Sequence, residues 1–290
     1  MSEIYMKNIQ WFPGHMTKTR RMICSNISLV DAVVEILDAR IPLSSKNPDI
    51  NRFVGDKPKI MLLNKSGMAD QSATSKWISY YEKRGYTTLA IDCKTGYGVK
   101  NFIPTVREKV LASLLEKRNN SGMTGAPIRL MILGIPNVGK SSFINCIAQS
   151  KKAKVEDRPG VTRTKQWVKI DTNMELLDMP GVLWPKFDDQ NVARNLAFTG
   201  AINDNIMDLE SLAMLLLESL ARKYPEAVQE RYKVDLSKKK DGFELLTEIG
   251  LHRGMLIRGG EVNYERAAIM VFDEFRGGKL GKLTLELPEE

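Results

Sequence analysis

Strongly apolar runs of strand length recur along the first 186 residues, and amphipathic stretches of helical length separate them. The apolar runs are continuous, without the alternation of a half-exposed strand, which indicates strands buried on both faces of a sheet. Such strands in alternation with helices are typical of a parallel sheet, so we expect an α/β fold with a mainly parallel sheet. The expected strands are 33–38, 59–63, 87–91, 128–133, 166–170 and 174–177, and the expected helices are 74–84, 101–116 and 141–149.

The pattern changes near residue 187, where helical periodicity replaces the strand-like runs. The stretch 209–223 shows this change best, because Leu212, Leu215, Leu216 and Leu220 recur on one face of a helix. Two further helices are expected at 242–249 and 263–275. One more is expected at 17–28, after a turn made by Pro13 and Gly14.

This change of pattern divides the chain into parts. A polar, glycine-bearing stretch at 117–127 indicates a linker within the first part. The three expected parts are a basic N-terminal segment at 1–30 that packs on the α/β domain, the α/β domain at 31–186, and a smaller, mainly helical domain at 187–290.

Every conspicuous polar motif of the chain lies at the carboxyl end of an expected strand. In open α/β sheets, that edge of the sheet is where ligands bind. Six strands that deliver polar residues to one edge are hard to explain by packing alone. We therefore expect a ligand site at this edge.

The most informative motif follows the strand at 128–133. Gly134 is followed five positions later by Gly139, Lys140 and Ser141, which is the phosphate-loop pattern G-x-x-x-x-G-K-[ST]. The glycines let backbone N–H groups point at phosphate oxygens, while Lys140 reaches the terminal phosphates and the Ser141 hydroxyl can ligate Mg²⁺. With a strand before it and a helix after it, the motif predicts binding of a nucleoside triphosphate. We expect the contacts from Asn137, Val138, Gly139, Lys140, Ser141 and Ser142.

A second nucleotide motif follows the strand at 174–177. Asp178 and Gly181 form the pattern D-x-x-G, in which the aspartate supports Mg²⁺ and the glycine N–H senses the terminal phosphate. Coupled to the phosphate loop, this short pattern becomes informative. Between the two motifs, the hydroxyl of Thr162 could complete the Mg²⁺ shell and hold a second switch loop. Thr164 is its rival, and an ordinary surface threonine is the other alternative.

Two motifs that resemble guanine-binding elements lie upstream of the phosphate loop. The strand end Asn64-Lys65 resembles the N-K-x-D motif of GTPases, and the loop at Cys93-Lys94 resembles the S-A-K loop that supports the base. Ordinary GTPases place both motifs downstream, so their order here indicates a circular permutation. A parallel sheet tolerates this change because strand pairing, and not strand order along the chain, holds it together. The residues expected near the base are Asn64, Lys65, Ser66, Gly67, Asp92 and Cys93.

Long sequence strings extend this likeness over nearly the full chain. They lie at 11–16, 38–42, 134–141, 158–162, 166–168, 177–187, 266–268 and 275–279. In these strings the chain resembles the circularly permuted GTPases, and specifically the ribosome biogenesis GTPase A family of bacteria. The resemblance implies GTP hydrolysis coupled to late assembly of the large ribosomal subunit. It also implies GTP and GDP as ligands and ribosomal RNA as the partner surface.

The chain departs from the family pattern at position 67. The N-K-x-D motif would place an aspartate there, but the chain has Gly67. Without that carboxylate the paired hydrogen bonds to guanine are lost, which can reduce discrimination by roughly 10²–10⁵. Asp70 could reach the base if the loop is remodelled, or base selectivity could be relaxed. GTP remains the expected nucleotide, with an ATP-tolerant relative as an alternative.

The residue just after D-x-x-G is Val182, where ordinary GTPases often have a glutamine that orients the attacking water. We therefore expect slow turnover that a partner accelerates. His15, in a Pro-Gly loop that could swing over the site, is the candidate for orienting water, and packing or RNA contact is its alternative role. Asn137 could coordinate K⁺ beside the phosphates, as in related potassium-activated GTPases, or simply form a turn. A non-hydrolysing nucleotide-binding scaffold is the alternative function.

Composition and cysteine usage restrict the cellular setting. No apolar run approaches the roughly 18 residues of a membrane span, and the N-terminus lacks the pattern of a signal peptide. The three cysteines are scattered and odd in number, which suits a reducing compartment and suggests neither disulfides nor a zinc site. We expect a cytoplasmic protein without a membrane partner.

The formal net charge of +8 is unevenly distributed. Residues 1–185 hold 28 Lys and Arg against 16 Asp and Glu, whereas the remainder holds 15 against 19. The basic part fits a solvated surface or a polyanion such as RNA, and we expect no DNA partner. The candidates for RNA contact, each of which could also be a solvated charge, are Lys18, Arg20, Arg21, Arg276, Lys279 and Lys282.

Overall fold

The computed structural model describes residue 9 and residues 13–123, 125–149, 166–238 and 240–289. The chain forms two compact units. The first, which we call the sheet unit, comprises Phe12–Lys186 and Glu286–Glu290, and the second, the helical unit, comprises Met1–Trp11 and Phe187–Leu285. The candidate switch-loop residues Thr162 and Thr164 lie outside the described residues.

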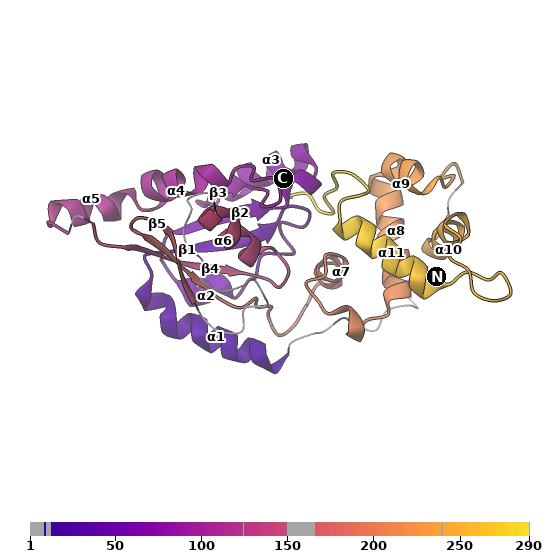
Figure 1. Ribbon diagram of the computed structural model, residues 1–290, viewed down its shortest axis with the longest axis horizontal. Helices are drawn as coiled ribbons and strands as arrows, with labels where there is room; N and C mark the ends of the chain where they lie inside the picture. The colour runs from indigo at the N-terminus through magenta and orange to yellow at the C-terminus, as the bar shows by residue number, and fades with distance from the viewer. Residues whose placement is uncertain (1–8, 10–12, 124, 150–165, 239, 290) are drawn as a thin grey trace. The chain divides into compact units, whose positions relative to one another are not determined.

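The sheet unit contains the strands β1 Ala32–Asp38, β2 Lys59–Asn64, β3 Thr87–Ala90, β4 Ile128–Gly134, β5 Gln166–Asp171 and β6 Met174–Asp178. They form one sheet in the order β3-β2-β1-β4-β6-β5, with helices on both sides (Figure 1). The first five in that order are parallel. At the centre, Ile36 of β1 lies opposite Leu62 of β2 and Gly134 of β4. The expected α/β fold with a mainly parallel sheet is therefore confirmed.

Strand β5 differs from the expectation that six strands deliver polar residues to one edge. It pairs with β6 in antiparallel fashion, so its carboxyl end lies at the opposite edge of the sheet. The cause is the short connection at 172–173, because a tight turn can join only antiparallel strands. At that edge Arg107 donates to Asp171 at 3.0 Å and to Asn173 at 2.6 Å. The ligand edge therefore receives the ends of five strands.

The helices of the sheet unit are α1 Gly14–Asn26, α2 Ile50–Val54, α3 Gln71–Glu82, α4 Phe102–Thr105, α5 Ala112–Asn120 and α6 Lys140–Gln149. Helix α5 includes residues 117–120, so the first part of the expected linker is helical. The expected helix at 101–116 is interrupted. A π-helical turn, Val106–Val110, follows α4, and Leu111 then leaves helical geometry with φ −117° and ψ 12°.

Helix α1 begins three residues earlier than the sequence pattern predicted, at Gly14 instead of Thr17. Pro13 has φ −59°, and its carbonyl accepts a hydrogen bond from the Met16 N–H at 2.9 Å. Proline therefore starts the helix, because its ring fixes a φ angle that suits the first turn. As a consequence, His15 lies in a helical turn and not in a loop.

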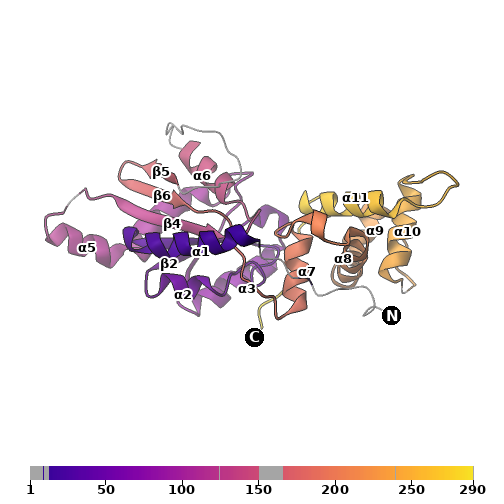
Figure 2. The same ribbon diagram turned by 90° about the horizontal axis from the view of Figure 1, so that it is seen from below.

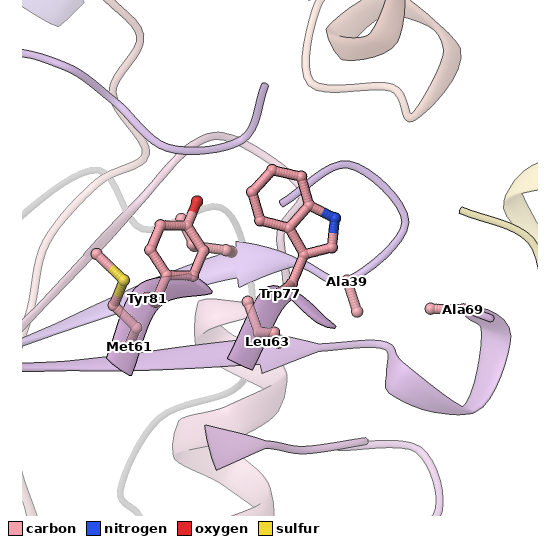
Figure 3. Close-up of a cluster of buried hydrophobic side chains, with 7 residues drawn as sticks. Ala39, Met61, Leu63, Ala69, Trp77 and Tyr81 are labelled. Atoms are coloured by element: carbon pink, nitrogen blue, oxygen red, sulfur yellow. The ribbon is translucent and has the colours of Figure 1, made fainter. Parts of the chain in front are cut away.

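A cluster of buried side chains holds α3 against the sheet (Figure 3). Leu37, Met61 and Leu63 point to one face of β1 and β2, and Trp77 and Tyr81 of α3 cover them. The two aromatic rings stack with centroids 5.7 Å apart. Since burial of apolar area is the main favourable contribution to folding, this cluster fixes the strand ends that carry the polar motifs.

The C-terminal residues pack on the same region of the sheet unit. The Trp77 indole donates to the carbonyl of Glu286 at 3.0 Å. The Glu286 carboxylate accepts from the Ser44 N–H at 2.7 Å and from the Ser44 hydroxyl at 2.6 Å. The chain therefore leaves the sheet unit after Lys186 and returns to it at Glu286.

The helical unit contains α7 Gln190–Phe198, α8 Leu209–Lys223, α9 Pro225–Tyr232, α10 Gly242–His252 and α11 Tyr264–Arg276. Helix α8 packs against each of the other four (Figure 2). Asp208 caps α8 through the Ser211 N–H, and Leu212, Leu216 and Leu220 are fully buried or nearly so. Among the described residues, no helix is long and apolar enough to cross a membrane.

We predict that Glu286→Ala lowers the free energy of unfolding by roughly 1–2 kcal/mol, because two charge-assisted hydrogen bonds to Ser44 are lost. Urea unfolding of the full chain measures the change. Glu289→Ala, at an exposed position of the same segment, is the matched control and should leave the midpoint unchanged. Equal midpoints for the two variants would show that the Glu286 contacts add nothing to stability.

Candidate nucleotide-binding site

The phosphate loop joins β4 to α6 at the ligand edge of the sheet. Gly139 has φ +102°, and a Cβ atom there would lie 2.3 Å from Asn64 Nδ2, so both backbone and space require glycine. Lys140 is the first residue of α6 and is 8% exposed. Its ammonium group donates to the carbonyls of Gly134 at 3.2 Å and Ile135 at 3.0 Å. The loop is thus curled around its own lysine.

The position of Lys140 changes its protonation behaviour. Burial lowers the pKa of the Lys140 ammonium group to about 8, and the nearby Asp178 carboxylate partly opposes this shift. Asp178 is itself 6% exposed at the end of β6. The arrangement brings one buried cation and one buried carboxylate near each other at the ligand edge of the sheet.

The D-x-x-G loop is tied directly to the phosphate loop. The Val182 N–H donates to the Gly134 carbonyl at 3.2 Å, and the Val182 carbonyl accepts from Asn47 Nδ2 at 3.1 Å. A Cβ atom at Gly181 would lie 2.9 Å from the backbone of Pro136. The Val182 side chain is 0% exposed. It is therefore a packing residue at the position where other GTPases carry a glutamine.

The base-binding side is organised by the carboxyl end of β2. Asn64 Nδ2 donates to the Val138 carbonyl at 2.9 Å, and its Oδ1 accepts from the Cys93 N–H at 3.3 Å. Lys65 has a left-handed backbone, with φ +62°, and its ammonium group donates to the Asn137 carbonyl at 2.9 Å. One amide and one ammonium group thus connect the N-K motif to both of its neighbouring loops.

A buried ion cluster that the sequence did not mark as part of the site supports Lys65. Asp38, at the end of β1, accepts from Arg40 Nε at 2.9 Å, from an Arg40 terminal nitrogen at 2.8 Å and from Lys65 at 2.9 Å. Burial opposes ionisation of Asp38, but Arg40 and Lys65 outweigh it and hold the pKa of the carboxyl well below its usual range. The signal available in the sequence was D-x-R directly after a buried strand.

Asp70 does not take the base-reading role that the remodelled-loop alternative gave it. Its carboxylate accepts from the Ala73 N–H at 2.8 Å, which makes Asp70 the N-cap of α3. The short turn Ser66–Met68, which contains Gly67, separates it from the N-K motif. That alternative is therefore wrong.

His15 occupies the exposed first turn of α1, so its expected place in a mobile Pro-Gly loop is wrong. The next residue, Met16, is fully buried, and its sulfur accepts a hydrogen bond from the Leu183 N–H at 3.5 Å. Leu183 follows Val182 directly. The first turn of α1 therefore packs on the D-x-x-G loop and presents His15 beside it.

Oxygen donors that suit Mg²⁺ meet near Lys140. The Ser141 hydroxyl lies at the start of α6 and the Asp178 carboxylate at the end of β6. Hard oxygen ligands of this kind fit a Mg²⁺ ion that binds mainly through substrate phosphates and water. Within the described part of the chain, no group of three or more His, Cys, Asp and Glu forms a separate metal cage. Asn137 is exposed with φ +57°, the geometry of a turn.

The helical unit carries a second candidate site, a hollow of about 1320 Å³ between α9 and the segment after α11. Two of the expected RNA contacts, Lys279 and Lys282, line it and are exposed. Glu226 and Glu230 are its acidic residues. We call it the basic hollow, after the basic side chains that line it, which are Lys223, Arg231, Lys233, Arg253, Lys279 and Lys282.

The other candidates for RNA contact have different surroundings. Lys18 and Arg21 are exposed on α1, and Arg20 pairs with Asp49 at 3.2 Å. Arg276 donates to both oxygens of Asp204, at 2.6 and 2.8 Å, and to the Phe198 carbonyl at 3.0 Å. These bonds hold the helical unit together, a structural role that the sequence did not reveal.

Five parallel strand ends that carry a phosphate loop, a D-x-x-G loop and an upstream N-K motif define a circularly permuted P-loop GTPase. A family described as 50S ribosome-binding GTPase matches residues 129–241. The ribosome biogenesis GTPase A of Bacillus cereus is 45% identical over 282 residues, which cover 97% of this chain and 95% of that protein. The chain belongs to the ribosome biogenesis GTPase A family.

Solved structures agree with this assignment. The GDP-bound structure of YlqF matches with a TM-score of 0.68 at 26% identity, and covers 93% of this chain and 100% of that one. The GNP-bound crystal structure of YlqF from T. maritima matches with a TM-score of 0.65 at 25% identity, and covers 94% and 99%.

We predict that GTP binding near pH 8 draws protons onto Lys140. With a pKa of about 8, the ammonium charge is present below that pH and lost above it, so triphosphate affinity falls as the pH rises. Titration calorimetry in two buffers of different ionisation enthalpy should show uptake of about half a proton at that pH.

Lys140→Arg is the control, because arginine stays protonated and the ionisations of the nucleotide itself are common to both proteins. The Lys140→Arg variant should bind GTP without the additional uptake of protons. Equal proton uptake by wild type and variant would contradict the assigned protonation of Lys140.

Proposed function

We infer that this GTPase is an assembly factor that binds the immature large ribosomal subunit and promotes its late maturation. It turns over slowly alone and faster on the ribosomal particle. The observation that carries the proposed slow turnover is the buried Val182, which leaves the D-x-x-G loop without a water-orienting side chain at the usual position. The names of the relatives and of the matching family point to the same process and to the 50S subunit.

In the proposed mechanism, the phosphate loop binds the triphosphate and Lys140 neutralises its terminal groups. A bound Mg²⁺, held by Ser141 and supported by Asp178 and Thr162, would supply further charge neutralisation. Gly181 senses the terminal phosphate through its N–H group. Because the Val182 N–H is bonded to Gly134, movement of the D-x-x-G loop also changes the phosphate loop.

His15 orients the attacking water once the particle has docked. Its support is geometric: Met16 anchors the first turn of α1 on the D-x-x-G loop, while His15 remains exposed. K⁺ at Asn137 would add a second positive charge at the phosphates.

Ribosomal RNA is the partner proposed for the basic hollow of the helical unit. Lys and Arg side chains gather there although the chain from residue 186 onward carries more acidic than basic residues. A local concentration of cations on an otherwise acidic part of a protein is expected to bind phosphates. We place the protein in the cytoplasm, where ribosomal particles assemble.

Phosphate release with and without large-subunit particles tests the catalytic proposal. Wild type should be strongly stimulated, and His15→Ala should lose roughly 10²–10⁴ of the stimulated rate while it keeps its GTP affinity. Thr17→Ala, exposed on the same helix, is the matched control. If the particles do not raise the rate of phosphate release by wild type, the protein is better explained as a non-hydrolysing scaffold. If they stimulate the His15→Ala variant as strongly as wild type, His15 has no part in the mechanism.

The basic hollow makes a separate prediction. Lys279→Ala combined with Lys282→Ala should weaken particle binding and lower the slope of log affinity against log salt by about two. The control pair, Lys238→Ala with Arg258→Ala, removes two exposed charges of the same unit that do not line the hollow. If both pairs lower the slope equally, the hollow is not a specific RNA contact.

A further inference from the structure

The space beside Gly67 is already filled. Gly67 is the fourth residue of the N-K-x-D pattern and lies in the turn Ser66–Met68. A Cβ atom at this position would lie 2.1 Å from Asp92 Oδ2 and 3.2 Å from Asp92 Cγ. Real Cβ contacts are never that short, so the carboxylate of Asp92 occupies the place where a side chain at position 67 would begin.

Backbone N–H groups hold the Asp92 carboxylate in that place. Oδ2 accepts from the Gly67 N–H at 3.1 Å, and Oδ1 accepts from the N–H groups of Lys94 at 2.8 Å and Thr95 at 3.3 Å. Asp92 is 5% exposed. Each carboxylate oxygen has two acceptor positions, so Oδ2 retains one for a ligand. A group fixed in this way is preorganised for recognition.

The carboxylate also belongs to the nucleotide edge of the sheet. The Ser66 N–H donates to the Ile91 carbonyl at 3.1 Å, which joins the N-K turn to the loop that carries Asp92. The next residue, Cys93, donates its N–H to Asn64, and Asn64 in turn donates to the phosphate loop. Asp92 is therefore connected through two hydrogen bonds to the backbone that would hold the phosphates.

We propose that Asp92 selects the base, and that Oδ2 of its carboxylate accepts a hydrogen bond from the 2-amino group of guanine. It thereby takes over the role that N-K-x-D gives to the side chain at position 67. Adenine has no amino group at that position and is rejected, because the buried carboxylate oxygen would then face no donor. The inference rests on the proposed binding of GTP at this site and specifies how its base is read.

Xanthine separates base reading from a purely structural role of Asp92. It has a carbonyl oxygen where guanine has its amino group, so an amide suits it better than a carboxylate. Asp92→Asn loses the acceptor for the Gly67 N–H, because an NH2 group replaces Oδ2. It keeps Oδ1 as the acceptor for Lys94 and Thr95, so two of the three bonds that hold the loop remain. A loop-capping Asp92 predicts unchanged base preference in this variant. A base-reading Asp92 predicts a switch from guanine to xanthine nucleotides.

The experiment measures dissociation constants of GDP, ADP and XDP by titration calorimetry. Wild type should prefer GDP over ADP by at least roughly 10²-fold. Asp92→Asn should lose roughly 10²-fold or more in GDP affinity and bind XDP more tightly than GDP. The matched control is Asp70→Asn, a neighbouring carboxylate that caps α3, and it should keep the wild-type order. If the Asp92→Asn variant binds GDP, ADP and XDP in the same order of affinity as wild type, the proposal is overturned.

A second variant covers the case in which Asp92→Asn does not fold. Gly67→Ala keeps the carboxylates of Asp92 and Asp70 but forces the Asp92 side chain to move. It should therefore reduce the preference for GDP without creating a preference for XDP. An unchanged preference in this variant would also overturn the proposal. Lys140→Ala should weaken all nucleotides alike. Failure of wild type to bind any nucleotide would instead reject the proposed function itself.

Discussion

Two consecutive carbonyl groups of the phosphate loop are turned toward β2, and the nucleotide site depends on that orientation. Asn64 and Lys65 each donate a hydrogen bond of 2.9 Å, to the carbonyls of Val138 and Asn137. In a trans peptide the N–H points opposite to the carbonyl, so the N–H groups of Val138 and Gly139 point away from β2. Two side chains of one strand end thus aim two donors at the side where phosphates are expected.

The loop at 38–49 connects this site to the rest of the sheet unit. Within it, the Ser45 hydroxyl accepts from the Asp38 N–H at 3.0 Å, Ser44 binds Glu286, and Asn47 binds the Val182 carbonyl. One loop therefore touches the end of the central strand, the C-terminal segment and the D-x-x-G loop. The two segments that bracket the helical unit in the sequence are held by the same piece of backbone. A displacement of the D-x-x-G loop would therefore also shift the loop at 38–49, which holds Glu286 where the chain returns to the sheet unit.

Local rules predicted much of this structure, and long-range contacts account for what they missed. The bounds of α8 followed from leucine periodicity, and the five parallel strands followed from continuous apolar runs. The direction of β5 depended on a tight turn and not on the strand itself. Arg276 looked like a surface charge because Asp204 lies 72 residues away in the sequence. The bond from Asn47 to Val182 spans 135 residues, and no periodicity can show such a pairing.

The region around Gly67 shows why a motif is better understood as a placement of atoms than as a string of letters. A search for N-K-x-D finds a defect at position 67, because the pattern specifies which residue carries the carboxylate. The fold specifies only where the carboxylate must lie. A loop that approaches from β3 can deliver it equally well, provided that position 67 has no side chain in its path. Gly67 suits this arrangement, since the Asp92 carboxylate would have to move to admit even the methyl group of alanine. The missing aspartate at position 67 and the buried Asp92, 25 residues later, therefore belong to one arrangement of the same loops.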